Sequence, residues 1–331
     1  MSSVIFDLEG PLSPMDHAYE VMRRFVPEGD LIFEVLSRYD DVVYLKERRE
    51  GYEPGTTLQL IVPFLLAHGV TEEGLKEVSE QADLTPGALE TVRELTCPKF
   101  IASTSYEQHA LTVASRLGIP ERNVYCTRLP LDEAPEPSEE ERELVREIER
   151  ELLELYPPDE VEDRELVDRV DELLGRLEGT SLGEFSARVK VVGGSRKAAV
   201  VEDVCESLGL EVEEVACIGD SITDVEMLRA VREGGGLAVA FNGNEYCIPE
   251  ADVAVAAPSL IAILPILETF FEHGKEEALE VAFELEGREV NPGVEAEILV
   301  VEEATEEEME EFIERSERMR ERVRGEAGKL G

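Results

Sequence analysis

Five short, mainly apolar runs, spread widely along the chain, constrain the fold more than any other feature of the sequence. They lie at 4–6, 99–102, 215–218, 237–241 and 251–255. Runs of this kind are typical of parallel strands buried between two layers of helices. Helical patterns lie between them, for example at 107–117 and 197–208, each followed by a glycine suited to a helix C-cap. This alternation predicts an α/β fold whose open parallel sheet collects polar residues at the carboxyl ends of its strands.

Two stretches are too long and too helical to be simple crossovers between strands. Residues 15–95 carry four helical patterns, which predict a helical cap inserted after the first strand. Residues 131–186 carry two amphipathic patterns on either side of a Pro-Pro pair, which predict an acidic helical hairpin as a second insertion. The chain is therefore expected to divide, in order, into core 1–14, cap 15–95, core 96–130, hairpin 131–186, core 187–273 and an acidic tail with an amphipathic helix, 274–331.

The net charge excludes some classes of partner. The chain has 76 acidic and 32 basic residues, a formal charge of −44, so it repels nucleic-acid backbones and anionic lipid and is not expected to bind either. Its apolar stretches are too short to span a bilayer, which predicts a cytoplasmic protein without membrane insertion. Most of the charge falls in the hairpin and the tail, which we expect to lie outside the catalytic core. Their acidic helices offer a surface for a protein partner or for a second copy of the chain.

The polar residues at the strand ends form an ordered set. DLEG at 7–10 follows the first strand, STS at 103–105 the second, Lys197 opens a later helix, and GDSITD at 219–224 follows another strand. Taken separately each is weak: Ser103 alone suits a helix N-cap, and Lys197 is placed by spacing, with Lys190 as the alternative. In this order, however, they resemble the four motifs of the haloacid dehalogenase superfamily of phosphohydrolases.

The resemblance implies a Rossmann-like core and phosphatase activity on a small phosphorylated metabolite. Asp7 would attack phosphorus and form an aspartyl-phosphate, while Glu9 would protonate the leaving alcohol and then activate water. The side chains expected to bind phosphate oxygens are those of Ser103, Thr104 and Lys197. The expected oxygen ligands of a Mg²⁺ ion come from Asp7, the backbone carbonyl of Glu9, Asp220 and Asp224.

Glutamate stands at position 9, where the superfamily's phosphatases usually carry aspartate. A glutamate there resembles the phosphoserine phosphatase-like branch, which includes a phosphotransferase, so transfer to an alcohol stays open. Stretches at 9–13, 37–42 and 103–107 also resemble an archaeal protein of the same superfamily named as a subunit of an energy-converting hydrogenase. The alternative to a phosphatase is therefore a non-catalytic or regulatory subunit of a larger complex. The five cysteines are scattered and supply no iron–sulfur or nickel site.

Four further polar residues are open to two interpretations. The pair Asp40–Asp41 in the cap either contacts the substrate or belongs to a turn at a helix end. His17 and His109 lie near strand ends that should face the site, although a partly buried helix histidine is the simpler interpretation of each.

Overall fold

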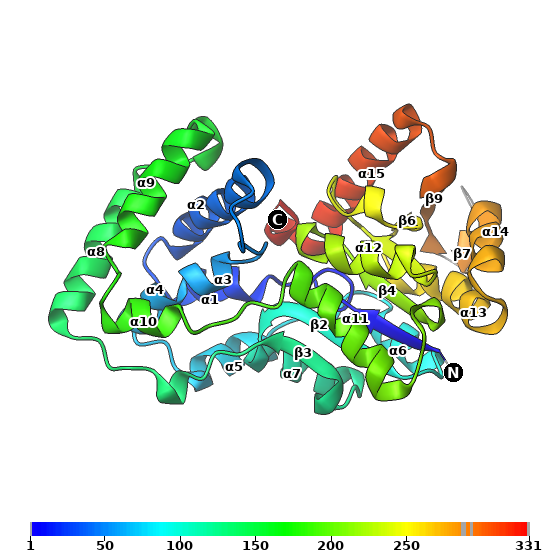
Figure 1. Ribbon diagram of the computed structural model, residues 1–331, viewed down its shortest axis with the longest axis horizontal. Helices are drawn as coiled ribbons and strands as arrows, with labels where there is room; N and C mark the ends of the chain where they lie inside the picture. Colours follow the sequence, from blue (N-terminus) through cyan, green and yellow to red (C-terminus); the bar gives the residue numbers. More distant parts are fainter. Residues whose placement is uncertain (1, 286–288, 292–293, 330–331) are drawn as a thin grey trace.

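The computed structural model describes residues 2–285, 289–291 and 294–329 of the chain. A seven-stranded sheet forms its centre (Figure 1), in the spatial order β3-β2-β1-β4-β5-β6-β9. The strands are β1 (Ser3–Phe6), β2 (Lys99–Tyr106), β3 (Val124–Thr127), β4 (Val215–Gly219), β5 (Leu237–Phe241), β6 (Val253–Ala256) and β9 (Glu297–Val300). The first six run parallel and β9 runs antiparallel to β6, so the predicted α/β fold with a parallel sheet is confirmed. A separate pair is formed by β7 (Glu289–Asn291) and β8 (Val294–Glu295).

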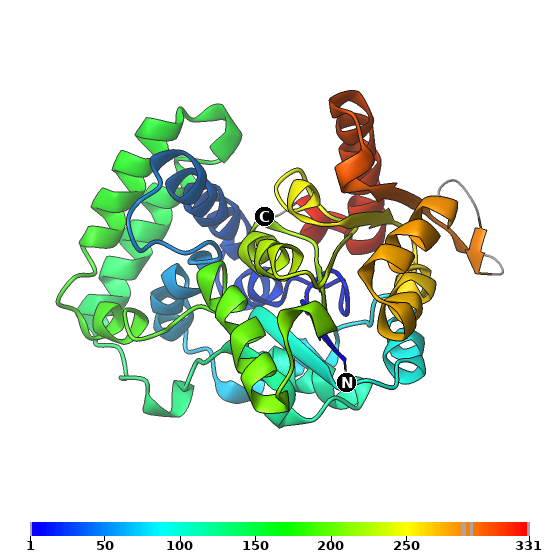
Figure 2. The same cartoon turned by 45° about the vertical axis from the view of Figure 1, so that its right-hand side comes forward.

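Successive residues of each buried strand point to opposite faces of the sheet, and both faces are covered by helices. In β1, Val4 and Phe6 pack in one apolar cluster and Ile5 in another. The first cluster is covered by α6 (Ala88–Glu94), α7 (Glu107–Leu117), α13 (Leu264–His273) and α14 (Lys275–Leu285). The second is covered by α11 (Ser195–Leu208), α12 (Val225–Glu233) and α15 (Glu306–Arg324). Figure 2 shows these layers from a second direction.

The two predicted insertions pack together as one helical body beside the sheet (Figure 1). A single apolar cluster joins Leu36 and Phe64 from the first insertion to Ile148 and Val170 from the second. The helices of this body are α1 (His17–Phe25), α2 (Gly29–Val42), α3 (Thr57–Leu60), α4 (Val62–Ala67), α5 (Glu72–Glu80), α8 (Glu139–Leu153), α9 (Asp163–Gly175) and α10 (Ser181–Ser186). None of the described helices has the length and apolar character needed to cross a membrane.

The tail differs from its expected position. Its strand β9 pairs with β6 and closes that edge of the sheet, and Phe312 of α15 is buried in the apolar cluster on one face. The expectation that the tail lies outside the catalytic core is therefore wrong. The physical reason is that β6 would otherwise expose a row of unpaired backbone groups, which a tail strand can satisfy.

The strand order places a crevice above the middle of the sheet. β1 lies between β2 and β4, and the order of the strands reverses between β1 and β4. In open α/β sheets, ligands bind outside the carboxyl ends of the strands at such a reversal. Phe6, the last residue of β1, lies opposite Ile218 of β4, so the residues that follow the two strands meet at this point.

Candidate active site

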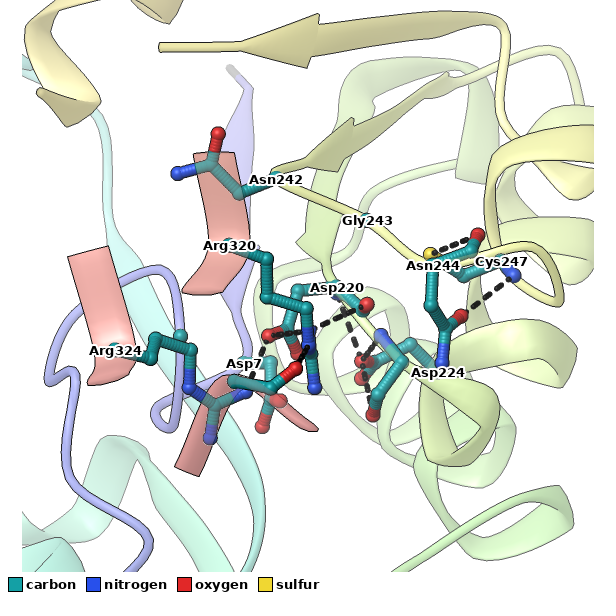
Figure 3. Close-up of polar contacts among 12 residues, drawn as sticks. Asp7, Asp220, Asp224, Asn242, Gly243, Asn244, Cys247, Arg320 and Arg324 are labelled. Carbon is teal, nitrogen blue, oxygen red and sulfur yellow. Dashed lines mark hydrogen bonds and ion pairs between the residues drawn. The ribbon is translucent and has the colours of Figure 1, made fainter. Parts of the chain in front are cut away.

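Three carboxylates meet at the carboxyl ends of β1 and β4 (Figure 3). Asp7 directly follows β1, Asp220 directly follows β4, and Asp224 precedes the first turn of α12. All three are buried, and one carboxylate oxygen from each lies within 4.8 Å of the others. The register of β1 and β4 brings Asp7 to Asp220, and the turn after β4 places Asp224 beside them.

Lys197 compensates part of this negative charge. It lies in the first turn of α11, is fully buried, and places Nζ 2.8 Å from Asp7 Oδ1 and 2.7 Å from Asp224 Oδ1. Burial alone would lower the pKa of Lys197, but the charges of Asp224 and Asp7 outweigh it and raise the pKa. The alternative, Lys190, is exposed and bonds the carbonyl of Ala187. The structure therefore brings Lys197, and not Lys190, to the carboxylates.

Two oxygens of the cluster remain open. Asp220 Oδ1 is buried without a hydrogen-bond partner among the described residues, and the same part of the chain offers no donor to Asp7 Oδ2. By contrast, Asp224 Oδ1 faces Lys197, and its Oδ2 accepts hydrogen bonds from the backbone N–H groups of Asp220 and the next residue. Burial and then the charge of Asp224 raise the pKa of Asp7, whereas Lys197 lowers it, and the net shift is upward. Buried carboxylate oxygens without donors fit a hard divalent cation such as Mg²⁺.

Gly10 allows the chain after β1 to turn close beneath this cluster. Its φ is +101°, a conformation that other residues rarely adopt. A Cβ atom at this position would lie 2.0 Å from Asp220 Oδ2. The glycine of the DLEG motif is thus required both by the turn and by the closeness of the carboxylate.

The carboxyl group of Glu9 lies apart from the three aspartates. Its Oε1 accepts hydrogen bonds from the backbone N–H of His17, at 3.0 Å, and from the Ser105 hydroxyl. Burial, followed by the charge of Asp16, raises the pKa of Glu9 to about 7. A carboxyl group with such a pKa is able to give and take a proton at neutral pH. The predicted metal contact through the Glu9 backbone carbonyl remains a prediction.

The two residues of β2 that are expected to bind phosphate differ in their surroundings. Ser103 is fully buried, and its hydroxyl accepts a hydrogen bond from the backbone N–H of Ser105. Thr104 lines a cavity of about 80 Å³ together with Asp7 and Glu9, and its hydroxyl has no partner in the described part of the chain. Of the two, Thr104 is the one that faces the cavity.

The cap contributes the pair Asp40–Asp41 to the same cavity. Asp40 is buried, and its Oδ2 accepts hydrogen bonds from the backbone N–H groups of Gly55 and Thr57 and from the Thr57 hydroxyl, so it holds a turn of the cap. Burial, and then the charge of Asp40, raises the pKa of Asp41 to about 8. Both carboxylates therefore line the cavity wall, and Asp40 also organises the cap.

Two arginines that no motif marks reach the cluster from α15 (Figure 3). Arg324 Nη1 lies 2.7 Å from Asp220 Oδ2, and Arg320 Nη1 bonds both that oxygen and the Asp220 backbone carbonyl. Their side chains are only 5% and 3% exposed, respectively. The surrounding Glu-Arg pattern is typical of a solvated helix, so the sequence does not distinguish these two arginines from exposed ones. The sequence signal for the buried face is the four-residue spacing of Phe312, Ser316 and Arg320, and in the structure all three are buried.

Comparison with known proteins agrees with this arrangement. A family model described as haloacid dehalogenase-like hydrolase matches residues 132–257. A solved structure of a gene product from Archaeoglobus fulgidus is 34% identical, with a TM-score of 0.84, over 100% of this chain and 99% of that one. The chain belongs to the haloacid dehalogenase-like hydrolases.

Other relatives of this hydrolase are more distant. A phosphoserine phosphatase from Archaeoglobus fulgidus is 29% identical over 96 residues, which span 28% of this chain and only 27% of that curated relative. A solved phosphoserine phosphatase, a phospho-aspartyl intermediate analogue, is 17% identical with a TM-score of 0.52, over 80% of this chain and 97% of that one. At that level of identity the likeness concerns the fold.

Behind Glu9, the hydrolase buries two histidines. The rings of His17 and His109 stack with their centroids 4.7 Å apart and their planes 9° apart, and both residues are fully buried. The Nε2 atom of His17 bonds the carbonyl of Leu75, at 3.0 Å, so this nitrogen carries the proton of a neutral ring. Burial lowers the pKa of His17 to about 4 and that of His109 well below its usual range. Both rings are therefore neutral, and more deeply buried than the sequence suggested.

Acidification is expected to destabilise the hydrolase through His17. In the unfolded chain this group takes up a proton as the pH falls below about 6.5, whereas in the folded protein it does so only near pH 4. Between these values the unfolded state binds more protons, so the free energy of unfolding falls by roughly 2–4 kcal/mol as the pH falls. His17→Gln keeps a donor for Leu75 and should remove this contribution. The measurement is urea unfolding of both proteins at pH 7.5, 5.5 and 4.5.

The matched control for this prediction is His273→Gln, because His273 is exposed. It should leave the pH dependence of stability unchanged. An equal slope in wild type and His17→Gln would show that protonation of this ring does not drive the acid destabilisation.

Proposed function

We propose that the protein is a Mg²⁺-dependent phosphatase that hydrolyses a small phosphomonoester through an aspartyl-phosphate on Asp7. The observation that carries this proposal is the buried cluster of Asp7, Asp220 and Asp224 around Lys197, with two carboxylate oxygens left open. The cluster lies at the reversal of strand order, where α/β folds bind their ligands. Phosphoryl transfer requires this combination of a nucleophile, positive charge and proton control.

In the first step, Asp7 attacks phosphorus. A bond forms between its carboxylate oxygen and phosphorus while the bond from phosphorus to the ester oxygen breaks. The leaving alcohol takes its proton from Glu9, whose carboxyl group lines the same cavity and has a pKa near 7. Lys197 holds one oxygen of Asp7 in place and favours its ionised form.

In the second step, water attacks the aspartyl-phosphate. Glu9, now a carboxylate, takes the proton from water, and the bond from phosphorus to Asp7 breaks to release inorganic phosphate. The hydrogen bonds from His17 and Ser105 hold this carboxylate in one place for both roles. Thr104, whose hydroxyl is free of other partners in the described chain, is the side chain of β2 that would face the phosphate.

The open oxygens of Asp7 and Asp220 are the ligands that would hold Mg²⁺. A bound Mg²⁺ ion would neutralise phosphate oxygens and favour the ionised form of the crowded carboxylates. Asp224, whose oxygens already accept four hydrogen bonds, fixes Lys197 and the turn that follows β4.

A screen of small phosphomonoesters, with inorganic phosphate release as the readout, tests this function. Phosphoserine is the first compound to include, because one relative is named phosphoserine phosphatase. Turnover is expected with Mg²⁺, should be lost on adding EDTA, and should return when Mg²⁺ is supplied in excess. Alcohols added as acceptors distinguish a phosphotransferase, which uses the same aspartyl-phosphate. A purified, folded protein that turns over no phosphoester with Mg²⁺ would contradict the proposal and favour the alternative of a non-catalytic subunit.

A further inference from the structure

We propose that Arg324, from the tail helix α15, binds the phosphate group of the substrate. This inference rests on the proposed function and adds a binding residue from a segment that carries none of the family's motifs. It starts from the position of Arg324, which lines the cavity that also contains Asp7, Glu9 and Thr104.

The guanidinium of Arg324 is held from one side and open on the other. Its Nη1 donates to Asp220 Oδ2 and its Nε to the carbonyl of Pro14, at 3.3 Å. Its third nitrogen, Nη2, has no hydrogen-bond partner among residues 2–285, 289–291 and 294–329. A buried guanidinium with an unused edge is suited to a phosphate oxygen, because its planar set of donors matches phosphate geometry.

The charges around the cavity give Arg324 a role that Lys197 does not fill. Five other carboxylates, apart from Asp220, line this cavity: Asp7, Glu9, Asp16, Asp40 and Asp41. An incoming phosphate needs positive charge to overcome their repulsion. Lys197 is already placed between two carboxylates and does not line the cavity, whereas Arg324 does.

Arg320 lines the same cavity, but its contacts differ from those of Arg324. Its Nη1 bonds the backbone carbonyl of Asp220, at 2.9 Å, and its Nε bonds the carbonyl of Gly328, at 3.1 Å. These contacts attach α15 and the turn after it to the core. Because Arg320 also contacts the Asp220 carboxylate, that group keeps a positive partner when Arg324 is replaced. An Arg324 variant therefore tests the free edge of the guanidinium without leaving a bare buried charge.

One other arrangement would explain the same contacts. Arg324 would then serve only as a positive charge that substitutes for a metal ion beside Asp220, without any part in binding substrate. The two explanations predict different effects of replacing Arg324. If Arg324 binds phosphate, its loss weakens phosphate binding. If it only competes with the cation, its loss strengthens Mg²⁺ binding.

The test is isothermal titration of the full chain with Mg²⁺ alone and with inorganic phosphate in saturating Mg²⁺. Arg324→Gln should weaken phosphate binding by at least about tenfold, since charge-assisted hydrogen bonds contribute about 1.5–3 kcal/mol. Arg324→Lys keeps the charge but loses the planar donors, and it should fall between wild type and Arg324→Gln. The Kd of Mg²⁺ should change by less than about twofold in both variants. The control is Arg322→Gln, an exposed arginine of the same helix, which should bind phosphate as wild type does.

Two results would overturn the inference. One is a phosphate affinity for Arg324→Gln that equals the affinity of the control, in a protein whose wild type binds phosphate and turns over substrate. That result would leave the proposed function intact. The other is tighter Mg²⁺ binding with unchanged phosphate affinity, which would make Arg324 a substitute for the cation. If wild type binds no phosphate and hydrolyses no phosphoester, the proposed function itself fails, and this inference fails with it. Thermal unfolding of each variant shows whether it is folded. If Arg324→Gln is not folded, the phosphate affinity of Arg324→Lys decides between the two explanations.

Discussion

Replacement of Asp7 by asparagine should reduce the turnover of a phosphoester by at least about a thousandfold, as is typical when a nucleophile is removed. Asparagine has nearly the same shape as aspartate, but its amide does not form an acyl-phosphate. Asp224 still pairs with Lys197 in this variant, so the lysine is not left without a partner. The measurement is kcat in saturating Mg²⁺, with the best substrate from the screen.

The control for Asp7→Asn is Asp203→Asn, which removes the same charge from an exposed position on α11. This variant should keep wild-type turnover. An Asp7→Asn protein that retains more than about a tenth of wild-type kcat would contradict the covalent mechanism, since that loss is far smaller than removal of a nucleophile causes.

Replacement of Lys197 by methionine should lower the free energy of unfolding by about 3–5 kcal/mol, the usual cost of breaking a buried ion pair. The lysine is fully buried between Asp7 and Asp224, and methionine fills a similar volume without the charge. Two buried carboxylates would then repel each other without compensation. The measurement is urea unfolding at pH 7 in EDTA, followed by the same experiment in Mg²⁺, which should recover part of the loss.

Lys190→Met is the matched control, because Lys190 is exposed and its Nζ, within the described residues, bonds only the backbone carbonyl of Ala187. It should change stability by less than about 0.5 kcal/mol. Equal stabilities for the two variants would mean that the carboxylates beside Lys197 are protonated in the folded protein and need no counter-charge.

Most of the sheet was predictable because its strands are apolar on both faces and end abruptly. The runs at 4–6, 215–218 and 237–241 agree with β1, β4 and β5 to within one residue. β2 instead continues to Tyr106, beyond the polar residues that suggested its end, and passes through an irregularity after Ser103. β3 and β9 were not predicted, although each contains a short apolar run, at 124–126 and 298–300. Each is an edge strand that pairs with one neighbour in the sheet, and such pairing is not visible in a local pattern.

The aspartates and the lysine of the candidate site were predictable for a different reason. Asp7, Asp220 and Asp224 follow strand ends, and parallel strands carry such residues to one edge of the sheet. The contacts of Lys197 depend on how α11 packs, and spacing alone left Lys190 as an alternative. Arg324 was not predictable, because its role depends on the docking of α15, and its sequence surroundings match those of the exposed arginines on the same helix.

The pairing of Asp220 with Arg324 also bears on how the protein folds. These partners are 104 residues apart in sequence, and Arg324 bonds Pro14 across 310 residues. Phe312 of α15 packs in the same apolar cluster as Ile5 of β1 and Cys217 of β4, so α15 docks on a face that these strands have to form first. The parallel sheet is therefore expected to assemble before α15 docks, and until then the aspartates at the sheet edge are without their guanidinium partners. Phosphate affinity should accordingly be the last property to appear during refolding.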